Sequence, residues 1–366
     1  MTSPRARRLL EALLLAAILA VLAGIGVRLW RWWELRCWNE QAMELAFRFN
    51  QPGLDRAPVT IPGRPHDVMS YNRNPEAIKR RTTFHVTTDA RGYRGAGFED
   101  RKAPGTFRIA VVGECVAFGV GVEDDEPWPR ELEELLREAW PRAKVEVLDL
   151  GRVAPPREVF SEVRTALRTF GPDLLLLEPG ASTLAFPEHT GMKPFRLWLP
   201  DGRYRAILAD YRRGLEGARA QAARVGAPLA LITPTCSSFF LPDGDLFVKE
   251  IESFAARFGL PLVHTTRLVR AAEEAQGLAL ETEGGRQRLV DRTAGEREVL
   301  LDVPAPQGND KPHVAPEVYA WLDEHPEASQ ALMIDGNHPN PVGHTAIAAE
   351  VLRVLRDAGA LTALER

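Results

Sequence analysis

The feature that most constrains the fold is an alternation of short apolar runs with longer amphipathic segments, which begins at Phe107. The apolar runs have the length and composition of buried β-strands: residues 107–113, 145–150, 174–177, 228–233 and 261–263. The segments that follow them have helical spacing: residues 127–139, 158–170, 207–225, 246–258 and 341–358. This order is typical of βαβ units, so we predict an α/β fold, a doubly wound parallel sheet with helices on both faces.

Two stretches interrupt this alternation. Residues 277–330 contain Gly284-Gly285, several prolines and mixed charge, so we predict an insertion that lies over the carboxyl edge of the sheet. A second insertion, at about 185–205, contains Phe195 and Trp198, which we expect to pack as a cover rather than to bind a ligand. We expect the same of Trp321 in the longer insertion.

The N-terminus has the composition of a transmembrane helix. Residues 9–27 are apolar except for Glu11, and in a helix they would span roughly the thickness of a bilayer core. Arginines precede this run, and tryptophans interleaved with arginines follow it, as at a membrane interface. A cleaved signal peptide is the alternative, although no small-x-small site followed by polar sequence comes after Val27. Basic residues flank both ends, so they leave the orientation open.

These features divide the chain into three parts. We predict a membrane anchor at residues 1–38, a linker and N-terminal collar at residues 39–105, and the α/β domain at residues 106–364. The 46 Lys and Arg residues are scattered, and the net charge is −4. Nucleic-acid binding needs a dense basic face, so we expect no nucleic-acid partner.

The cysteine content argues against a disulfide framework and a zinc site. The chain has three cysteines, Cys37, Cys115 and Cys236, and none forms a CxxC pair. A single Cys115–Cys236 bridge remains one alternative. Cys37 lies beside the predicted membrane segment, where it could be acylated or simply interfacial.

Three loops that directly follow predicted strands carry the residues of a candidate site. Their sequences are Gly113-Glu114-Cys115-Val116-Ala117-Phe118-Gly119, Asp149-Leu150-Gly151-Arg152-Val153-Ala154 and Glu178-Pro179-Gly180-Ala181-Ser182-Thr183. A fourth segment, Asp335–His344, precedes the last predicted helix. In open α/β sheets, sites form beyond the carboxyl ends of the strands, so we expect these segments to meet at one edge.

These segments resemble the SGNH/GDSL hydrolases of bacteria. The family's Gly-Asp-Ser nucleophile block is matched by Gly113-Glu114-Cys115, and its Asp-x-x-His block is intact as Asp335 and His338. Its Asn-x-Gly-x-x-Gly block is matched by Asp149, Gly151 and Ala154, and its Gly-x-Asn-Asp block by residues 180–183. The segment Thr87–Arg94 is also similar, and the resemblance covers about residues 82–182 and 333–358. It implies a flavodoxin-like sheet.

The resemblance implies an acyl-ester hydrolase with Cys115 as nucleophile, His338 as base and Asp335 as the carboxylate that orients the base. The Ala154 N–H and the Ser182 hydroxyl would stabilise the oxyanion, and no metal or organic cofactor is needed. A thiol suits this role, because an imidazolium and a helix N-terminus favour the thiolate. Ser182 is shorter than the family's asparagine, and loss of one oxyanion donor typically costs about 10²–10³ in rate.

The resemblance also implies a location and a substrate class. Such proteins act at the outer face of a bacterial inner membrane, so we expect a single-pass protein with its soluble domain on the periplasmic side. The substrate would be an acyl ester, including O-acyl groups on a glycan or lipid. Two alternatives stay open: an O-acyltransferase, and a catalytically degenerate protein that binds a glycan or a partner in the envelope. The sequence does not set the oligomeric state.

Each candidate residue also has a purely structural interpretation. Cys115 can be a small buried core residue, His338 can occupy a turn before the last helix, and Asp335 can be the N-cap of that helix. We expect His344 to pack or to cap the same helix. Arg152 is expected on the solvated surface, with binding of an anionic substrate as the alternative.

Overall fold

The computed structural model describes the following residues: 23–26, 51–60, 83–153, 156–180, 200–235, 244–275, 278–292, 297–305, 315, 317–318, 321 and 338–365. The chain divides into two compact units, Met1–Phe47 and Arg48–Arg366. Of the first unit only residues 23–26, which are helical, are described, so the predicted anchor otherwise lies outside the described residues. Among the described helices, none combines the length and the apolar character needed to cross a membrane.

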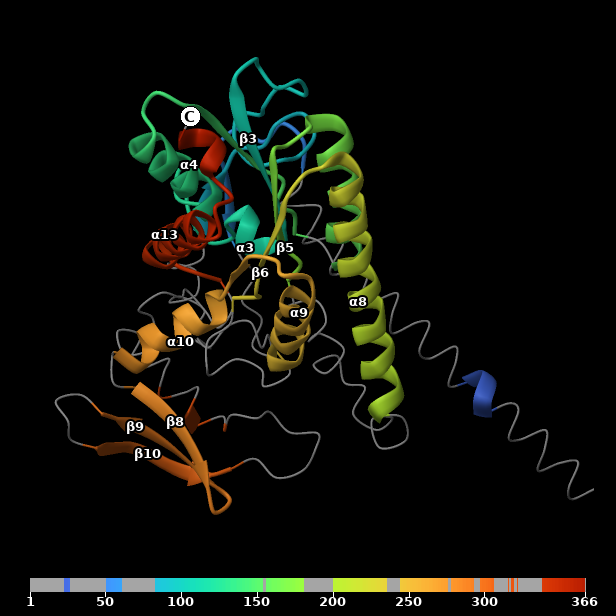
Figure 1. Cartoon of the computed structure of the whole chain (residues 1–366). Coiled ribbons are helices and arrows are strands. Elements are labelled where there is room, and N and C mark those ends of the chain that lie inside the picture. Colours follow the sequence, from blue (N-terminus) through green and yellow to red (C-terminus); the bar gives the residue numbers. More distant parts are fainter. Residues whose placement is uncertain are drawn as a thin grey trace, which may run out of the picture. The chain divides into compact units, whose positions relative to one another are not determined.

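The core of the second unit is a five-stranded parallel sheet with the order β4-β3-β5-β6-β7. Strands β3, β5 and β6 are labelled in Figure 1. Its strands are β3 (Thr106–Gly113), β4 (Lys144–Asp149), β5 (Leu174–Glu178), β6 (Leu229–Ile232) and β7 (Leu262–Val263). Counted along the chain within this sheet, the order is 2-1-3-4-5, which is the flavodoxin-like arrangement. The predicted α/β fold with a parallel sheet is therefore confirmed.

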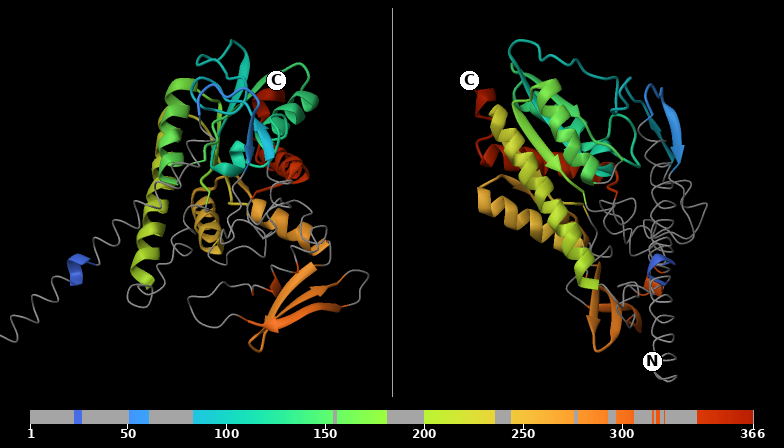
Figure 2. Two further views of the ribbon diagram at one scale, coloured as in Figure 1. Left: turned by 180° about the vertical axis from the view of Figure 1, so that it is seen from behind. Right: turned by 90° about the vertical axis from the view of Figure 1, so that its right-hand side faces the viewer.

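Helices cover both faces of this sheet (Figure 2). They are α4 (Trp128–Ala139), α5 (Pro156–Thr165) with its π-helical continuation Ala166–Phe170, α8 (Pro200–Val225), α9 (Gly244–Phe258), α10 (Thr265–Ala275) and α13 (Pro341–Asp357), and a 3₁₀ turn at Thr362–Glu365 ends the chain. On one face, Ala110 and Val112 of β3 belong to a buried cluster that includes Val159 of α5 and Leu215 of α8. Because both faces of the strands are covered, they are continuous apolar runs rather than alternating ones.

The connection after β3 contains a short helix that the sequence analysis did not predict. This helix, α3 (Cys115–Phe118), begins two residues beyond the end of β3 and is closed by Gly119 in the left-handed conformation, with φ 76°. A Cβ on Gly119 would lie 2.6 Å from Cγ of Pro127. Only glycine combines this backbone conformation with so close a neighbour, so Gly119 ends α3 where it does.

The predicted insertion contains a separate antiparallel sheet with the order β10-β9-β8. Its strands are β8 (Leu278–Glu283), β9 (Arg286–Asp291) and β10 (Glu298–Pro304). Gly284 and Gly285, with φ of 57° and 75°, form the two-residue turn between β8 and β9. This sheet has a small core of its own, against which Trp321 packs, as expected. The placement of the insertion over the edge of the parallel sheet stays a prediction.

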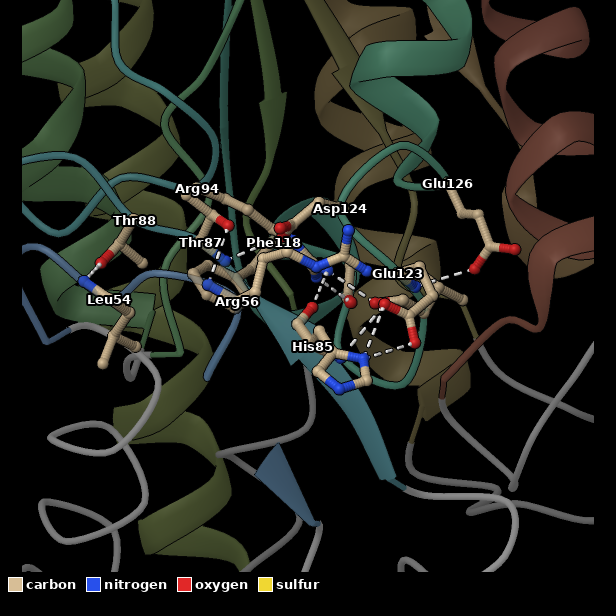
Figure 3. A network of polar contacts seen from close by, with 12 residues as sticks. Leu54, Arg56, His85, Thr87, Thr88, Arg94, Phe118, Glu123, Asp124 and Glu126 are labelled. Carbon is tan, nitrogen blue, oxygen red and sulfur yellow. Dashed lines mark hydrogen bonds and ion pairs between the residues drawn. The ribbon is translucent and has the colours of Figure 1, made fainter. Parts of the chain in front are cut away.

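The described part of the predicted collar is hydrogen-bonded to the α/β domain. Strands β1 (Ala57–Thr60) and β2 (Thr83–Val86) pair in antiparallel fashion. The His85 N–H donates to Glu123 Oε2 at 3.3 Å, and the Thr87 N–H donates to Asp124 Oδ1 at 2.9 Å (Figure 3). Strand β2 and the residue that follows it are thereby hydrogen-bonded to the loop between α3 and α4.

Candidate functional site

The carboxyl ends of three neighbouring strands each carry a buried acidic side chain. Asp149 ends β4, Glu178 ends β5, and Glu114 directly follows β3. In a 2-1-3-4-5 sheet the strand order reverses between the first and third strands, which here are β3 and β5. Such a switch point is where open α/β sheets bind ligands, so the candidate site forms around the ends of these two strands.

Cys115 and His338 come together at this edge. Cys115 is the first residue of α3, and His338 lies shortly before α13. Their side chains are hydrogen-bonded to each other, and both residues are buried, with exposed fractions of 5% and 3%. Cys115 is a reduced cysteine, so the alternative bridge to Cys236 is not formed. The two residues that the motifs predict to meet therefore do so, while their catalytic roles stay a prediction.

The environment of the Cys115 thiol favours its protonated form. Burial raises the pKa of Cys115, and the neighbouring carboxyl groups of Glu114 and Glu178 raise it further. The charge of His338 and its hydrogen bond act in the opposite direction but do not compensate for the desolvation. The expectation of a favoured thiolate is therefore wrong for the resting protein, because burial outweighs the effect of the imidazole.

The other predicted members of the site lie outside the described residues. These are Asp335, expected to orient His338, and the two expected oxyanion donors, Ala154 and Ser182. Cys236 and Cys37 lie outside them as well. The positions of all five relative to the thiol stay predictions.

Glu178 begins the third of the predicted loops, but the sequence analysis assigned it no role in the site. Its Oε2 accepts a hydrogen bond from the Ala117 N–H at 3.2 Å, and its carboxyl also accepts the N–H of Glu114. Burial raises the pKa of Glu178 well above its usual value, and the neighbouring Glu114 carboxyl raises it further. A signal was present in the sequence: Glu178 is the single charged residue that directly continues the apolar run 174–177, and charged residues are rarely buried without a partner.

A buried arginine from the N-terminal segment holds the turn that follows α3 (Figure 3). The Arg94 side chain is 1% exposed. Its guanidinium donates to the carbonyl oxygens of Phe118 at 2.9 Å and Val122 at 2.6 Å, and also to that of Gly119. Its Nε lies 3.4 Å from Asp124 Oδ1. One side chain thus provides donors for three carbonyl groups at the end of α3, and thereby positions the helix that carries the thiol.

The turn that matches the family's second block packs closely against α3. The Gly151 N–H donates to Asp149 Oδ1 at 2.8 Å, and a Cβ on Gly151 would lie 2.4 Å from the backbone nitrogen of Phe118. Gly151 is therefore required for this close approach. Burial raises the pKa of Asp149 to about 7, while the Gly151 hydrogen bond and the charge of Arg94 lower it.

This environment predicts a pH-dependent stability that Asp149→Asn removes. The unfolded carboxyl titrates near about 3.9, so between there and about pH 7 the folded protein binds more protons and stability falls as pH rises. We expect this group to cost on the order of a few kcal/mol by neutral pH. The variant, whose amide oxygen still accepts the Gly151 N–H, should lack this component. Urea unfolding at about pH 5 and about pH 8 measures it; an identical pH dependence in both proteins would contradict the prediction.

The helix cap considered for Asp335 and His338 belongs to another residue. Asn340 is the N-cap of α13, and its side chain accepts the Gly343 N–H at 2.8 Å. The His338 ring is therefore not the cap of α13, and its hydrogen bond is made to Cys115.

Two further residues have structural surroundings. His344 packs as expected: its Nδ1 accepts the Trp128 N–H at 3.0 Å, and burial lowers its pKa to about 3, so it is neutral. We expected Arg152 on the solvated surface, and this expectation is wrong. Its guanidinium stacks 4.4 Å from the Tyr93 ring centre, and its Nε lies 3.4 Å from Glu162 Oε2. The stacking uses the planar face of the side chain.

The strand order and the thiol–imidazole contact define the class of protein: a flavodoxin-like α/β protein with a nucleophile-type side chain and a base-type side chain at its switch point. Solved structures that are similar to this chain include esterases. The acetyl xylan esterase AlAXEase is 11% identical, with 68% of this chain and 100% of that chain covered and a TM-score of 0.44. Axe2, an acetylxylan esterase from Geobacillus stearothermophilus, is 13% identical, with 68% and 94% covered and a TM-score of 0.43.

AlinE4, an SGNH-hydrolase family esterase, is 17% identical, with 46% of this chain and 81% of that chain covered and a TM-score of 0.35. The solved structures that are similar to this chain therefore include a member of the family that the motifs resemble. The sequence matches no protein-family model, and it matches no curated protein.

Proposed function

We propose that this protein is an SGNH-type hydrolase of acyl esters, with Cys115 as the nucleophile and His338 as the base. The observation that carries the proposal is the hydrogen bond between their side chains at the switch point of the sheet. A nucleophile of this kind needs a base within hydrogen-bond reach. Asp335 is proposed to orient the imidazole, and the Ala154 N–H and the Ser182 hydroxyl to hold the oxyanion.

The proposed reaction has two steps. In the first, Sγ of Cys115 attacks the ester carbonyl while His338 takes the thiol proton; the alcohol then leaves with that proton, and a thioester remains on Cys115. In the second, a water molecule attacks the thioester, His338 takes one proton from it, and the sulfur recovers that proton as the acid leaves. A sugar hydroxyl in place of water would make the protein an O-acyltransferase. Since the thiol is the resting form, His338 removes its proton as the attack occurs.

We also propose that residues 9–27 tether the protein to the cell membrane, with the α/β domain on the extracytoplasmic side and an O-acyl group on a glycan or lipid as substrate. The apolar run and the tryptophans and arginines that follow it support the tether. Protection of the domain from protease added to intact spheroplasts would contradict this orientation.

A second candidate function is favoured by the burial of the thiol. A reduced cysteine that is 5% exposed and has a raised pKa also has the properties of a structural core residue. In that case the protein keeps the fold without the chemistry, and binds a glycan or a protein partner of the envelope.

Trapping of the acyl-enzyme separates the two functions. The full chain is mixed with p-nitrophenyl acetate, quenched in acid, and analysed by mass spectrometry of the Cys115-containing peptide. The hydrolase should carry an acetyl group on Cys115 that hydroxylamine removes, and His338→Ala should form it far more slowly. If acetylation of Cys115 is no faster than in the unfolded chain, the hydrolase proposal fails and the binding function is favoured.

A further inference from the structure

Two buried carboxyl groups approach Cys115 from neighbouring strands. Glu178 of β5 pairs in register with Gly113 of β3, and Glu114 is the next residue along the chain from Gly113. The exposed fractions of Glu114 and Glu178 are 2% and 1%. Both carboxyl groups act on the ionisation of the Cys115 thiol, and the charge of His338 acts on that of Glu178. The four groups therefore form one electrostatic cluster.

The backbone around Cys115 is built to seat these two acids. A Cβ on Gly113 would lie 2.9 Å from Glu178 Oε2, and a Cβ on Gly180 would lie 1.7 Å from Glu114 Oε2. Glu178 thus lies against Gly113 of the neighbouring strand, and Glu114 lies against Gly180 in the loop after β5; a larger residue at either glycine would displace the carboxyl. The fold admits both acids at the one point of the sheet edge where the thiol and the imidazole meet.

Glu178 also positions the thiol directly. Its carboxyl accepts the backbone N–H groups of Glu114 and Ala117, which lie on either side of Cys115 in the chain. Hydrogen bonds from backbone N–H groups to a charged acceptor are stronger than neutral ones. The first turn of α3 is therefore held by the same carboxyl that acts electrostatically on Cys115.

Two full negative charges at this site would repel each other, because both groups are desolvated and each raises the energy of the other's ionised form. The other titratable group that acts on this cluster is His338 before α13. Asp149 at the end of β4, Arg94 from the N-terminal segment and His344 on α13 are linked to one another or to His338. Arg94 already donates to four carbonyl oxygens, those of His85, Phe118, Gly119 and Val122, and is paired with Asp124, and His344 is neutral. Of these groups, His338 is the one whose imidazolium form would favour an ionised Glu178.

We propose that Glu114 and Glu178 act as one proton-holding pair behind Cys115: at neutral pH the two carboxyls carry one proton and one negative charge between them, and that charge adds to burial in holding Cys115 in the thiol form. In this arrangement Glu178 is a positioning residue, and it acts on the thiol through charge and through the α3 backbone. The inference goes beyond the proposed hydrolase, because it concerns the protonation of the site and holds whether or not the thiol attacks an ester.

A shared proton has a signature that two independent carboxylates lack. If Glu114→Gln or Glu178→Gln removes one carboxyl, the remaining one ionises and the site keeps its single negative charge. Each single variant should therefore leave the pH dependence of Cys115 ionisation nearly unchanged. Only the double variant loses the charge, so the Cys115 thiolate should then form at lower pH.

The test is the rate at which iodoacetamide alkylates Cys115 in the full chain as a function of pH, followed by mass spectrometry of the Cys115-containing peptide. The rate follows the thiolate fraction. We expect wild type and both single variants to agree closely, and the double variant to react roughly tenfold faster at neutral pH, as removal of one nearby charge predicts. Glu133→Gln removes a buried carboxyl on α4 that accepts the Val147 N–H and pairs with Arg137, and it should leave the profile unchanged.

Two outcomes would overturn the proposal. Equal, additive accelerations in the single variants would mean two independently ionised carboxylates, and an unchanged double variant would mean that the pair carries no charge.

The infrared band of protonated carboxyl groups gives a readout that needs no reagent at the thiol: either single substitution should remove one protonated carboxyl, and the double should remove no more. Thermal unfolding of each variant checks that it is folded. If p-nitrophenyl acetate does not acetylate Cys115, the alkylation rates and the infrared bands still test the carboxyl pair. The two proposals can therefore fail independently of each other.

Discussion

Cys115→Ala is expected to abolish hydrolysis of p-nitrophenyl acetate, and His338→Ala to lower kcat by a factor of about 10²–10⁴. The first variant lacks the atom that forms the covalent intermediate. The second keeps the thiol but lacks the group that removes its proton, and burial makes the unassisted thiolate scarce. Steady-state kinetics of the full chain measure both effects. The loss in His338→Ala should shrink as pH rises, because hydroxide then supplies the thiolate that the imidazole no longer generates.

The control for this prediction is another histidine. His264 lies between β7 and α10, where its Nδ1 is 3.4 Å from Glu252 Oε1. His264→Ala should leave kcat within about twofold of wild type, since the groups that act on its ring are Arg267, Glu252 and Glu350 and do not include Cys115. If Cys115→Ala turned over substrate at the wild-type rate, Cys115 would not be the nucleophile and the proposed mechanism would be wrong.

Arg94→Met is expected to destabilise the protein by about 3–5 kcal/mol, the largest stability loss we predict for a single side chain. The variant leaves the carbonyl oxygens of Phe118, Gly119 and Val122 without their buried donor. Unsatisfied buried acceptors cost their full desolvation energy. Urea unfolding measures the change, and Arg94→Lys should recover only part of it, because one ammonium cannot reproduce the fork of the guanidinium.

An exposed arginine provides the comparison. Arg286 on β9 is ion-paired with Asp302 at 2.7 Å, and its side chain is 46% exposed. Arg286→Met should cost less than about 1 kcal/mol, as is usual for surface ion pairs. Similar losses in both variants would show that Arg94 does not hold the end of α3 in the way described.

The parallel strands were predictable because their signal is local. The run 107–113 corresponds to β3 at Thr106–Gly113, and the run 145–150 to β4 at Lys144–Asp149, since strands covered on both faces are continuously apolar. The strands of the insertion were missed for the converse reason. They are partly exposed, and β9 alternates arginines with buried residues. The turn at Gly284-Gly285 was the available signal.

The sequence by itself determined the α/β class and predicted that Cys115 and His338 interact. Both predictions depend on apolar periodicity and on short motifs, which are properties of residues close together in the chain. Only the tertiary structure decided the surroundings of the thiol: its burial, the two carboxyls beside it, and Arg94 at the end of its helix. From sequence alone, a charged side chain is predicted to be exposed at the surface. They become buried site residues only when strands and loops far apart in the chain converge and supply the N–H and carbonyl partners that offset their desolvation.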